Sequence, residues 1–323
     1  EFFMYILKFK MKLRFIKIII VAIMVSMSSS IYGQTDPYEG LLEAIWLDSM
    51  TITAKKMGFD VDNFIEMVQS DTSFYQAFRN LRLLQHKATH EQEFYNEKGK
   101  LVDFYKAKTA LISAGKCKEI KYLSKEQSSN YAKKNGERKY LTAKLYERVF
   151  LPENLICPSE SSNEKTTKSE GIIDYYYGEL KRFIFQPGEK ANIPLIGNKT
   201  ALFSERMRKF YDYGIASKNY NDGTPCYVFS IKVKDAYSSK KNGKTVVKFM
   251  ETYFSRNDFQ VMGRKYEVVY PGPFFSFNIF VQVDLDYLGN KQYLPNTVKY
   301  SGNWDIPGRK REIGRFNMKV IQE

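Results

Sequence analysis

The chain has 323 residues, of which 43% are hydrophobic, and carries a formal net charge of +14. This length allows a sizeable buried core and excludes a disulfide-stapled miniprotein. The positive charge favours an anionic partner, such as an anionic membrane surface, or reflects a solvated basic surface. No RNA- or DNA-binding motif is present, so a nucleic-acid partner is not expected.

The N-terminal stretch has the organisation of a secretory signal peptide. Met11 opens a basic segment, residues 18–27 form an apolar run, and small and polar residues then lead to Gly33. The apolar run is about half of the ~20 residues that span a bilayer. We therefore expect a leader over residues 1–33, cleavage near Gly33, and a periplasmic or extracellular mature chain.

The first part of the mature chain, residues 34–92, is predicted to be helical. Residues 41–52 and 61–68 carry apolar stripes, and Asp71 is typical of the cap of a third helix. In that third helix Phe74, Phe78 and Leu81 share one face. These stripes indicate core packing.

From about residue 93 the pattern changes to strands and turns. The longest predicted strand covers residues 274–287, where seven apolar residues alternate with polar ones and only Phe280 is out of phase. At ~3.4 Å per residue such a strand reaches roughly 45 Å, which requires a curved sheet. Further strands are expected over residues 94–95, 101–111, 141–151, 172–177, 180–185, 227–233, 245–254, 266–270, 298–300 and 316–320, with a polar loop over 158–171 and a short helix capped by Ser204 and containing Met207, Phe210 and Tyr211.

These elements predict one mature domain over residues 34–323 of the α+β class. Its helical part is residues 34–92, and residues 93–323 form a curved antiparallel half-barrel with covering helices. No internal repeat and no second core are evident.

Few residues are candidates for chemistry. His86 and His90 would share one face of a helix at i, i+4 spacing, which makes them weak candidates for a metal site. Asp284 and Asp286 fall on one face of the long strand, at a separation that suits paired carboxylates. The solvated face of a sheet has the same pattern. We therefore expect no catalytic residue, no metal and no cofactor.

Three cysteines remain in the mature chain: Cys117, Cys157 and Cys226. They allow one disulfide, in three possible pairings, and one free thiol. Cys226 lies in an alternating strand and is expected to be a buried structural thiol.

The aromatic content is the most informative feature, with 24 Tyr, 24 Phe and 2 Trp. Many of these residues fall on strands whose aliphatic residues point to the same face. A curved sheet lined in this way encloses an apolar cavity or packs as a filled core, and both remain open. The candidate lining residues are Phe229, Ile231, Phe275, Phe277, Ile279, Val281 and Val283.

Five blocks of sequence resemble uncharacterised exported proteins of Bacteroidetes. They are RFIFQPG at 182–188, ALFSERM at 201–207, CYVFSI at 226–231, NDFQV at 257–261 and KYSGNWDI at 299–306. The order of strands and turns over residues 94–321 is similar to that of the lipoprotein-carrier (LolA/LolB-like) superfamily. Members of that superfamily are incomplete antiparallel barrels, closed by helices, that hold acyl chains. The resemblance implies this fold and an apolar ligand, and assigns no individual site residue.

The leading hypothesis is an exported, non-enzymatic protein that binds a lipid or another apolar ligand in a half-barrel cavity and handles lipids or lipoproteins in the cell envelope. One alternative is a structural or protein-interaction module of the envelope with a filled core. The other is a hydrolase that uses Asp284 and Asp286 or the His86 region.

Overall fold

The computed structural model describes residues 60–157, 187–191, 196–239, 243–272, 275–288, 292–306 and 308–321. The predicted signal peptide, the helix at 41–52, the polar loop at 158–171 and the strands at 172–177 and 180–185 lie outside these residues.

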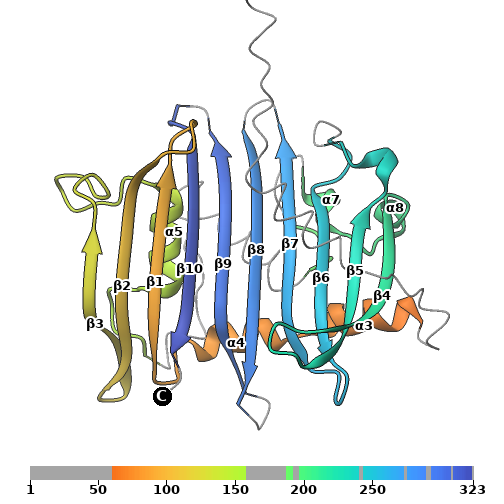
Figure 1. Cartoon of the computed structure of the whole chain (residues 1–323), viewed down its shortest axis with the longest axis horizontal. Coiled ribbons are helices and arrows are strands. Elements are labelled where there is room, and N and C mark those ends of the chain that lie inside the picture. The colour runs from red at the N-terminus through yellow and green to blue at the C-terminus, as the bar shows by residue number, and fades with distance from the viewer. Residues whose placement is uncertain are drawn as a thin grey trace, which may run out of the picture. The chain divides into compact units, whose positions relative to one another are not determined.

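The described part of the chain is organised around a ten-stranded antiparallel sheet (Figure 1). The strand order is β3-β2-β1-β10-β9-β8-β7-β6-β5-β4. Strands β4 to β10 therefore form a meander, which β1, β2 and β3 extend beyond β10. The strands are β1 His86–Tyr95, β2 Leu101–Ala114, β3 Cys117–Gln127, β4 Tyr211–Asn219, β5 Pro225–Val233, β6 Val247–Ser255, β7 Val261–Pro271, β8 Ser276–Tyr287, β9 Tyr293–Asp305 and β10 Glu312–Ile321.

The sheet is curved and does not close, because β3 and β4 lie at its two edges. The predicted α+β class with a curved antiparallel sheet is confirmed. In Figure 1, α3 and α4 run in line across the lower ends of the strands, and α5 lies beside β1 and β10. The helices are α3 Val61–Ser70, α4 Ser73–Asn80, α5 Leu141–Phe150, α7 Gly197–Thr200 and α8 Glu205–Arg208, with a 3₁₀ turn η2 at Asp235–Tyr237.

Aromatic rings hold these helices on one face of the sheet, here called the helix-covered face. Phe64 of α3 stacks on Phe229 of β5 with ring centroids 5.9 Å apart. Tyr146 of α5 meets Phe316 of β10 edge-on at 5.3 Å. Both pairs are deeply buried, so the helices complete the core.

Strand β8 forms as its alternating sequence predicts. Phe277, Ile279, Val281 and Val283 are buried in the core of the helix-covered face. Phe280 points to the opposite face, here called the outer face, where its ring lies 6.2 Å from that of Phe249. The residue out of phase with the pattern therefore has an aromatic partner on its own side of the sheet.

The predicted strand at 141–151 is wrong, because this segment forms α5. Its buried residues Thr142, Ala143 and Tyr146 recur at helical spacing. The helix begins against Glu312 of β10, whose carboxylate accepts hydrogen bonds from the Leu141 and Thr142 backbone N–H groups at 2.9 and 2.8 Å. A cap supplied from 170 residues away gives no local sequence signal.

The predicted end of the helical part at residue 92 is also wrong, because strand β1 begins at His86. Its inward positions include His90 and Gln92, which are polar and so hide the alternation. Both are buried and hydrogen-bonded, Gln92 Oε1 accepting from Tyr131 Oη at 3.0 Å. Pairing with β2 and β10 on both sides makes this segment a strand.

The short helix predicted after Ser204 is confirmed only in part. Helix α8 ends at Arg208, and Tyr211 already belongs to β4. Ser204 donates its side-chain hydrogen bond to Ala201 O at 2.7 Å and does not cap the helix. The hairpin predicted between β1 and β2 is present, and its turn uses Gly99 at φ 73°.

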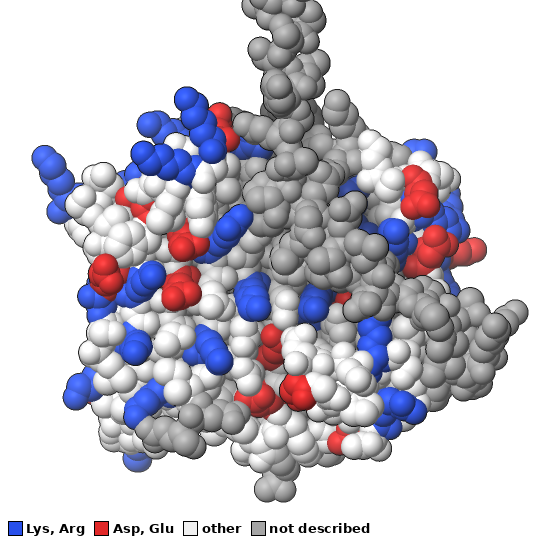
Figure 2. Space-filling view, viewed as in Figure 1, with Lys and Arg blue, Asp and Glu red and all other residues white. Residues whose placement is uncertain are grey.

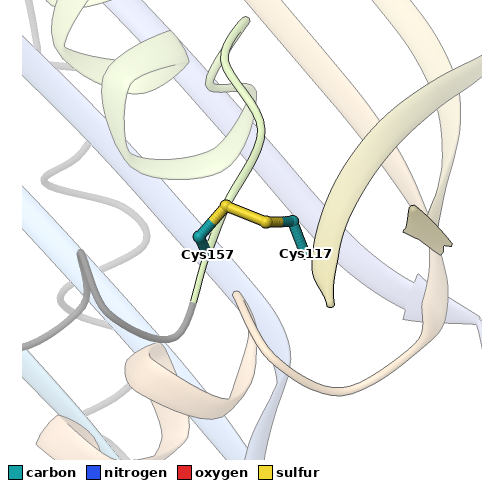
Figure 3. Close-up of a disulfide and its surroundings, with 2 residues drawn as sticks. All are labelled: Cys117 and Cys157. Carbon is teal, nitrogen blue, oxygen red and sulfur yellow. A yellow bond between two sulfur atoms is a disulfide. The ribbon is translucent and has the colours of Figure 1, made fainter. Parts of the chain in front are cut away.

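Cys117, at the start of β3, forms a disulfide with Cys157, which follows α5 (Figure 3). Of the three pairings that the sequence allows, this one is present, and Cys226 is free and buried. Backbone hydrogen bonds of 2.8 Å join Lys118 and Ile156 in both directions beside it. None of the described helices is long and apolar enough to cross a membrane.

Candidate functional site

The seven candidate lining residues do share the helix-covered face of the sheet. Six of them belong to its buried core, and Phe275, just before β8, is half-buried against that core. The register places Phe277 opposite Tyr270 of β7 and Trp304 of β9. The strands thus gather apolar side chains that lie far apart in sequence.

These residues fall into two regions with different surroundings. Phe229 and Ile231 of β5 have no exposed surface, and Phe64 of α3 stacks directly on Phe229. Phe254 of β6 also contacts Phe64 edge-on at 5.5 Å. This region is a closely packed part of the core beneath α3.

The second region is an aromatic cluster where β7 ends and β8 begins, made of Tyr270, Phe275, Phe277 and Trp304. The centroid distances are 4.9 Å for Tyr270 to Phe275, 5.9 Å for Tyr270 to Phe277 and 5.0 Å for Phe277 to Trp304. Phe275 and Trp304 remain partly exposed. A contiguous, partly exposed set of rings is what an apolar ligand binds.

Sequence reasoning did not assign Tyr270 and Trp304 to the site. Tyr270 lies in a predicted strand and Trp304 in one of the blocks that carry the resemblance, but neither position says which strand lies beside it. Only the pairing of β8 with β7 and β9 brings both rings to Phe277. The sequence signal that could have found Tyr270 and Trp304 is the two-residue apolar period shared by β7, β8 and β9.

Small cavities are present among the described residues. One of about 20 Å³ lies between α5, β1 and β2 and is lined by residues that include His86, His90 and Phe150. Another of about 10 Å³ lies beside Trp304 and Glu312. Each has room for about one water molecule.

The histidines do not form the predicted helical pair, because both lie on strand β1. His90 is hydrogen-bonded through Nδ1 to Tyr146 Oη and through Nε2 to Thr109 Oγ1, each at 2.9 Å. Burial, with a smaller contribution from His86, lowers the pKa of His90 to about 4. Among the described residues no group of three His, Cys, Asp or Glu side chains is placed to hold a metal. His90 is thus a neutral core residue whose two ring nitrogens are both occupied.

Asp284 and Asp286 lie on the outer face, and each has its own hydrogen-bond donors. Asp284 accepts from the Tyr220 hydroxyl and from Gln282 Nε2. Asp286 accepts from Asn296 Nδ2 at 2.9 Å. These hydroxyl and amide donors stabilise the two carboxylates at their positions on β8.

Cys226 has the environment of a structural thiol. It packs in a small buried cluster with Val228 and Tyr253. Burial raises the pKa of its thiol to about 11, so the group is protonated at neutral pH and is a poor nucleophile.

Charges of both signs alternate over the outer face. The register sets Glu91 opposite Lys106, Glu93 opposite Arg315, and Glu251 opposite Lys265. Figure 2 shows basic and acidic side chains interspersed over the side of the molecule in view. Opposite charges set across neighbouring strands in this way stabilise the sheet.

The fold and site define an α+β protein with a curved, unclosed antiparallel sheet whose helix-covered face is apolar. No protein-family model matches the chain, and no curated protein matches its sequence. Among solved structures it is similar to a domain of a putative outer membrane lipoprotein-sorting protein from Vibrio parahaemolyticus, at 7% identity and a TM-score of 0.25, over 81% of this chain and 89% of that one. It is also similar to a DUF1329 family protein from Desulfovibrio piger, at 11% identity and a TM-score of 0.19, over 78% of this chain and 92% of that one. At these scores neither likeness carries an argument about function.

Proposed function

We propose that this chain is an exported, non-catalytic protein that binds an apolar ligand, such as an acyl chain, at the aromatic cluster of Tyr270, Phe275, Phe277 and Trp304. The observation that carries the proposal is the partial exposure of Phe275 and Trp304 within one contiguous set of rings, on a face where Phe229 is packed beneath Phe64 of α3. We extend this proposal to a role in handling lipids or lipoproteins in the cell envelope.

Burial of an acyl chain at such a site can supply enough free energy for binding. Each buried CH₂ group of a chain contributes ~0.8 kcal/mol, so ten of them contribute about 8 kcal/mol before the costs of association. Loss of translational freedom and chain ordering offset much of this gain. A micromolar or weaker affinity is the expected range, which suits a carrier that must release its ligand.

Export is supported by two independent features. The first 33 residues have the basic, apolar and small-residue regions of a signal peptide. The Cys117–Cys157 disulfide requires an oxidising compartment to form and persist.

The test is thermal unfolding of the mature chain with and without palmitate. A ligand at 100 times its dissociation constant adds about 2.7 kcal/mol of stability, which raises Tm. Phe275→Ala should reduce this increase, because the ring is part of the site and only half-buried. Tyr287→Ala, at the other end of β8 and 46% exposed, is the matched control and should leave the increase unchanged. No shift with palmitate or with other acyl probes means that the proposal is wrong.

A filled-core interaction module is the second candidate, favoured by the close packing of Phe229 and Ile231 beneath α3. Its interaction surface would include edge strand β3, where Tyr122 and Leu123 are 42% and 52% exposed. An exposed edge strand pairs readily with another chain. Absence of acyl binding, together with loss of a partner's binding in Leu123→Lys, would favour this candidate.

A further inference from the structure

One corner of the outer face departs from the alternation of charges described above. Four exposed lysines, here called the lysine array, lie there on four neighbouring strands: Lys319 of β10, Lys87 of β1, Lys108 of β2 and Lys121 of β3. Lys319, for example, follows Met318, which has no exposed surface in the core of the helix-covered face. In Figure 2 the part of the outer face over these strands, at the lower left, carries basic side chains.

The register of the strands sets the distances within the lysine array. Thr89 lies opposite the lysines of β10 and β2, and Ala110 lies opposite those of β1 and β3. Each lysine is therefore a diagonal neighbour of the next one, and diagonal positions in an antiparallel sheet are about 7–8 Å apart. The four positive charges form a zigzag across the sheet, with an uncharged residue between those on alternate strands.

Acidic residues border the lysine array without entering it. Glu91 and Glu126 lie in the next row of the outer face, where Lys106 is directly opposite both of them. Glu119 lies on the edge strand, two residues before the lysine of β3. Among the described residues no ion pair joins the array lysines of β2, β3 and β10 to a carboxylate. Like charges at neighbouring positions of a sheet repel each other, so an external anion at the array lowers the free energy.

The lysine array has the features of a surface that docks on a membrane. Lysine ammonium groups are compact, strongly hydrated charges, which attract an anionic surface without the two-pronged geometry by which arginine holds a single phosphate. Ile321, opposite Lys87, is 39% exposed and adds an apolar side chain to the same surface. Lysines on an edge strand also discourage aggregation, but β1 and β10 lie inside the sheet, where that explanation does not apply.

We propose that the lysine array docks this protein on an anionic lipid bilayer. The inference goes beyond the proposed function, because the array lies on the opposite face of the sheet from the aromatic cluster. Clusters of about four to eight basic residues bind anionic membranes in this way, and each lysine near the surface raises the affinity about fivefold.

The experiment measures binding of the mature chain to sedimented vesicles, at low salt and with added sodium chloride. Wild type should bind vesicles of equimolar phosphatidylglycerol and phosphatidylcholine far more tightly than vesicles of phosphatidylcholine alone, and added salt should weaken the binding. Lys108→Gln, Lys121→Gln and Lys319→Gln together should weaken it about a hundredfold, at about fivefold per lysine. The three side chains are exposed, so an unchanged Tm checks that the variant is folded.

The matched control is Lys98→Gln with Lys134→Gln and Lys209→Gln, which removes the same number of exposed charges outside the array and should bind like wild type. If the control loses as much affinity as the array variant, net charge explains the binding and the inference is wrong. Equal binding of wild type to the two kinds of vesicle, or binding to neither, also overturns it. Binding to soluble polygalacturonate without binding to the anionic vesicles overturns it as well and assigns the array to an acidic polysaccharide. The increase in Tm with palmitate should be the same in the array variant as in wild type, so the proposed function is tested separately.

Discussion

Arg264 of β7 and Asp71, between α3 and α4, form an ion pair inside the protein. Arg264 Nη2 donates to Asp71 Oδ2 at 3.0 Å, and the two side chains are 1% and 7% exposed. Arg264 Nε also donates to Thr252 Oγ1 at 3.0 Å, and its guanidinium lies 4.3 Å from the centroid of the Phe74 ring. Burial lowers the pKa of Arg264, and the Asp71 carboxylate opposes that effect. The pair therefore ties the start of α4 to the middle of the sheet.

Removing the charge of Asp71 should strongly destabilise the fold. Asp71→Asn leaves a buried guanidinium without its counter-ion, which typically costs about 3–5 kcal/mol. The N-cap of α4 is Thr72, and not Asp71 as the sequence had indicated. Asp71 Oδ1 accepts the Ser73 N–H at 2.8 Å, and the asparagine oxygen can still accept this hydrogen bond. Urea unfolding measures the loss. Asp62→Asn breaks the exposed pair with Arg208 and should cost less than about 1 kcal/mol. Equal losses in the two variants would mean that burial of the Arg264 pair does not matter.

Stability should fall with acid because of His90. Its pKa is lowered to about 4 in the folded protein from 6.5. Between these values the unfolded chain binds more protons than the folded one, so stability is lost as pH falls from about 6.5 to about 4. The full loss is roughly 3 kcal/mol at 1.36 kcal/mol per pKa unit.

Urea unfolding at pH 6.5, 5.5 and 4.5 checks this expectation. Carboxylates also titrate at the acid end, so the informative quantity is the difference from His90→Gln, which should flatten the pH dependence. His86→Gln is the control, because His86 is only half-buried and should change the dependence less. An unchanged slope in His90→Gln contradicts the assignment.

The sequence predicted the strands in which apolar and polar residues alternate regularly. β8 and the hairpin at Gly99 are examples, because their apolar and turn residues are local signals. Of β1, only residues 94–95 were predicted, because its earlier inward positions carry His90 and Gln92, whose partners Tyr146 and Tyr131 come from distant segments. α5 was read as a strand because its cap is Glu312, near the other end of the chain.

The candidate site, too, was predicted only in part. The two-residue period placed Phe277 and Ile279 on the face that the helices cover. It could not separate Phe229, which is packed under α3, from Phe275, which is half-exposed. That distinction depends on where a helix lies on the sheet.

The Cys117–Cys157 disulfide should stabilise the fold substantially. It closes a loop with a sequence separation of 40, for which chain entropy predicts about 4 kcal/mol. Cys157→Ser should lose an amount of this order, measured by urea unfolding without reductant. Cys226→Ala is the control and should cost about 1 kcal/mol, since it removes one buried thiol.

Thiol alkylation gives a second measure of the same bond. The unfolded wild type should show one reactive thiol without reductant and three after reduction. Two or more reactive thiols before reduction would show that the disulfide is not formed.

A charge placed on the helix-covered face of β8 should strongly destabilise the fold. Val281 is 7% exposed and lies between Tyr266 of β7 and Tyr300 of β9. Val281→Asp should cost about 3–5 kcal/mol through an unpaired buried carboxylate. Asn278→Asp places the same charge on the outer face of the strand and should change stability by about 0.5 kcal/mol. Similar losses at both positions would mean that the register is different.

The last prediction concerns Gly302 of β9, over which the side chain of Tyr300 lies. A Cβ atom at Gly302 would be 2.8 Å from Tyr300 Cε1 and closer still to the hydroxyl. Gly302→Ala must therefore displace Tyr300, which accepts a hydrogen bond from Trp304 Nε1 at 2.6 Å. We expect a loss of about 1–3 kcal/mol from overpacking and a shift in Trp304 emission, measured in a Trp46→Phe background. Gly314, opposite Gly302 in β10, provides the control, since its Cβ would lie 3.2 Å from Phe94 Cε1 and require only a small adjustment. Gly314→Ala should stay within about 1 kcal/mol and leave the emission unchanged. An unchanged emission in Gly302→Ala would contradict the placement of Tyr300 over the glycine.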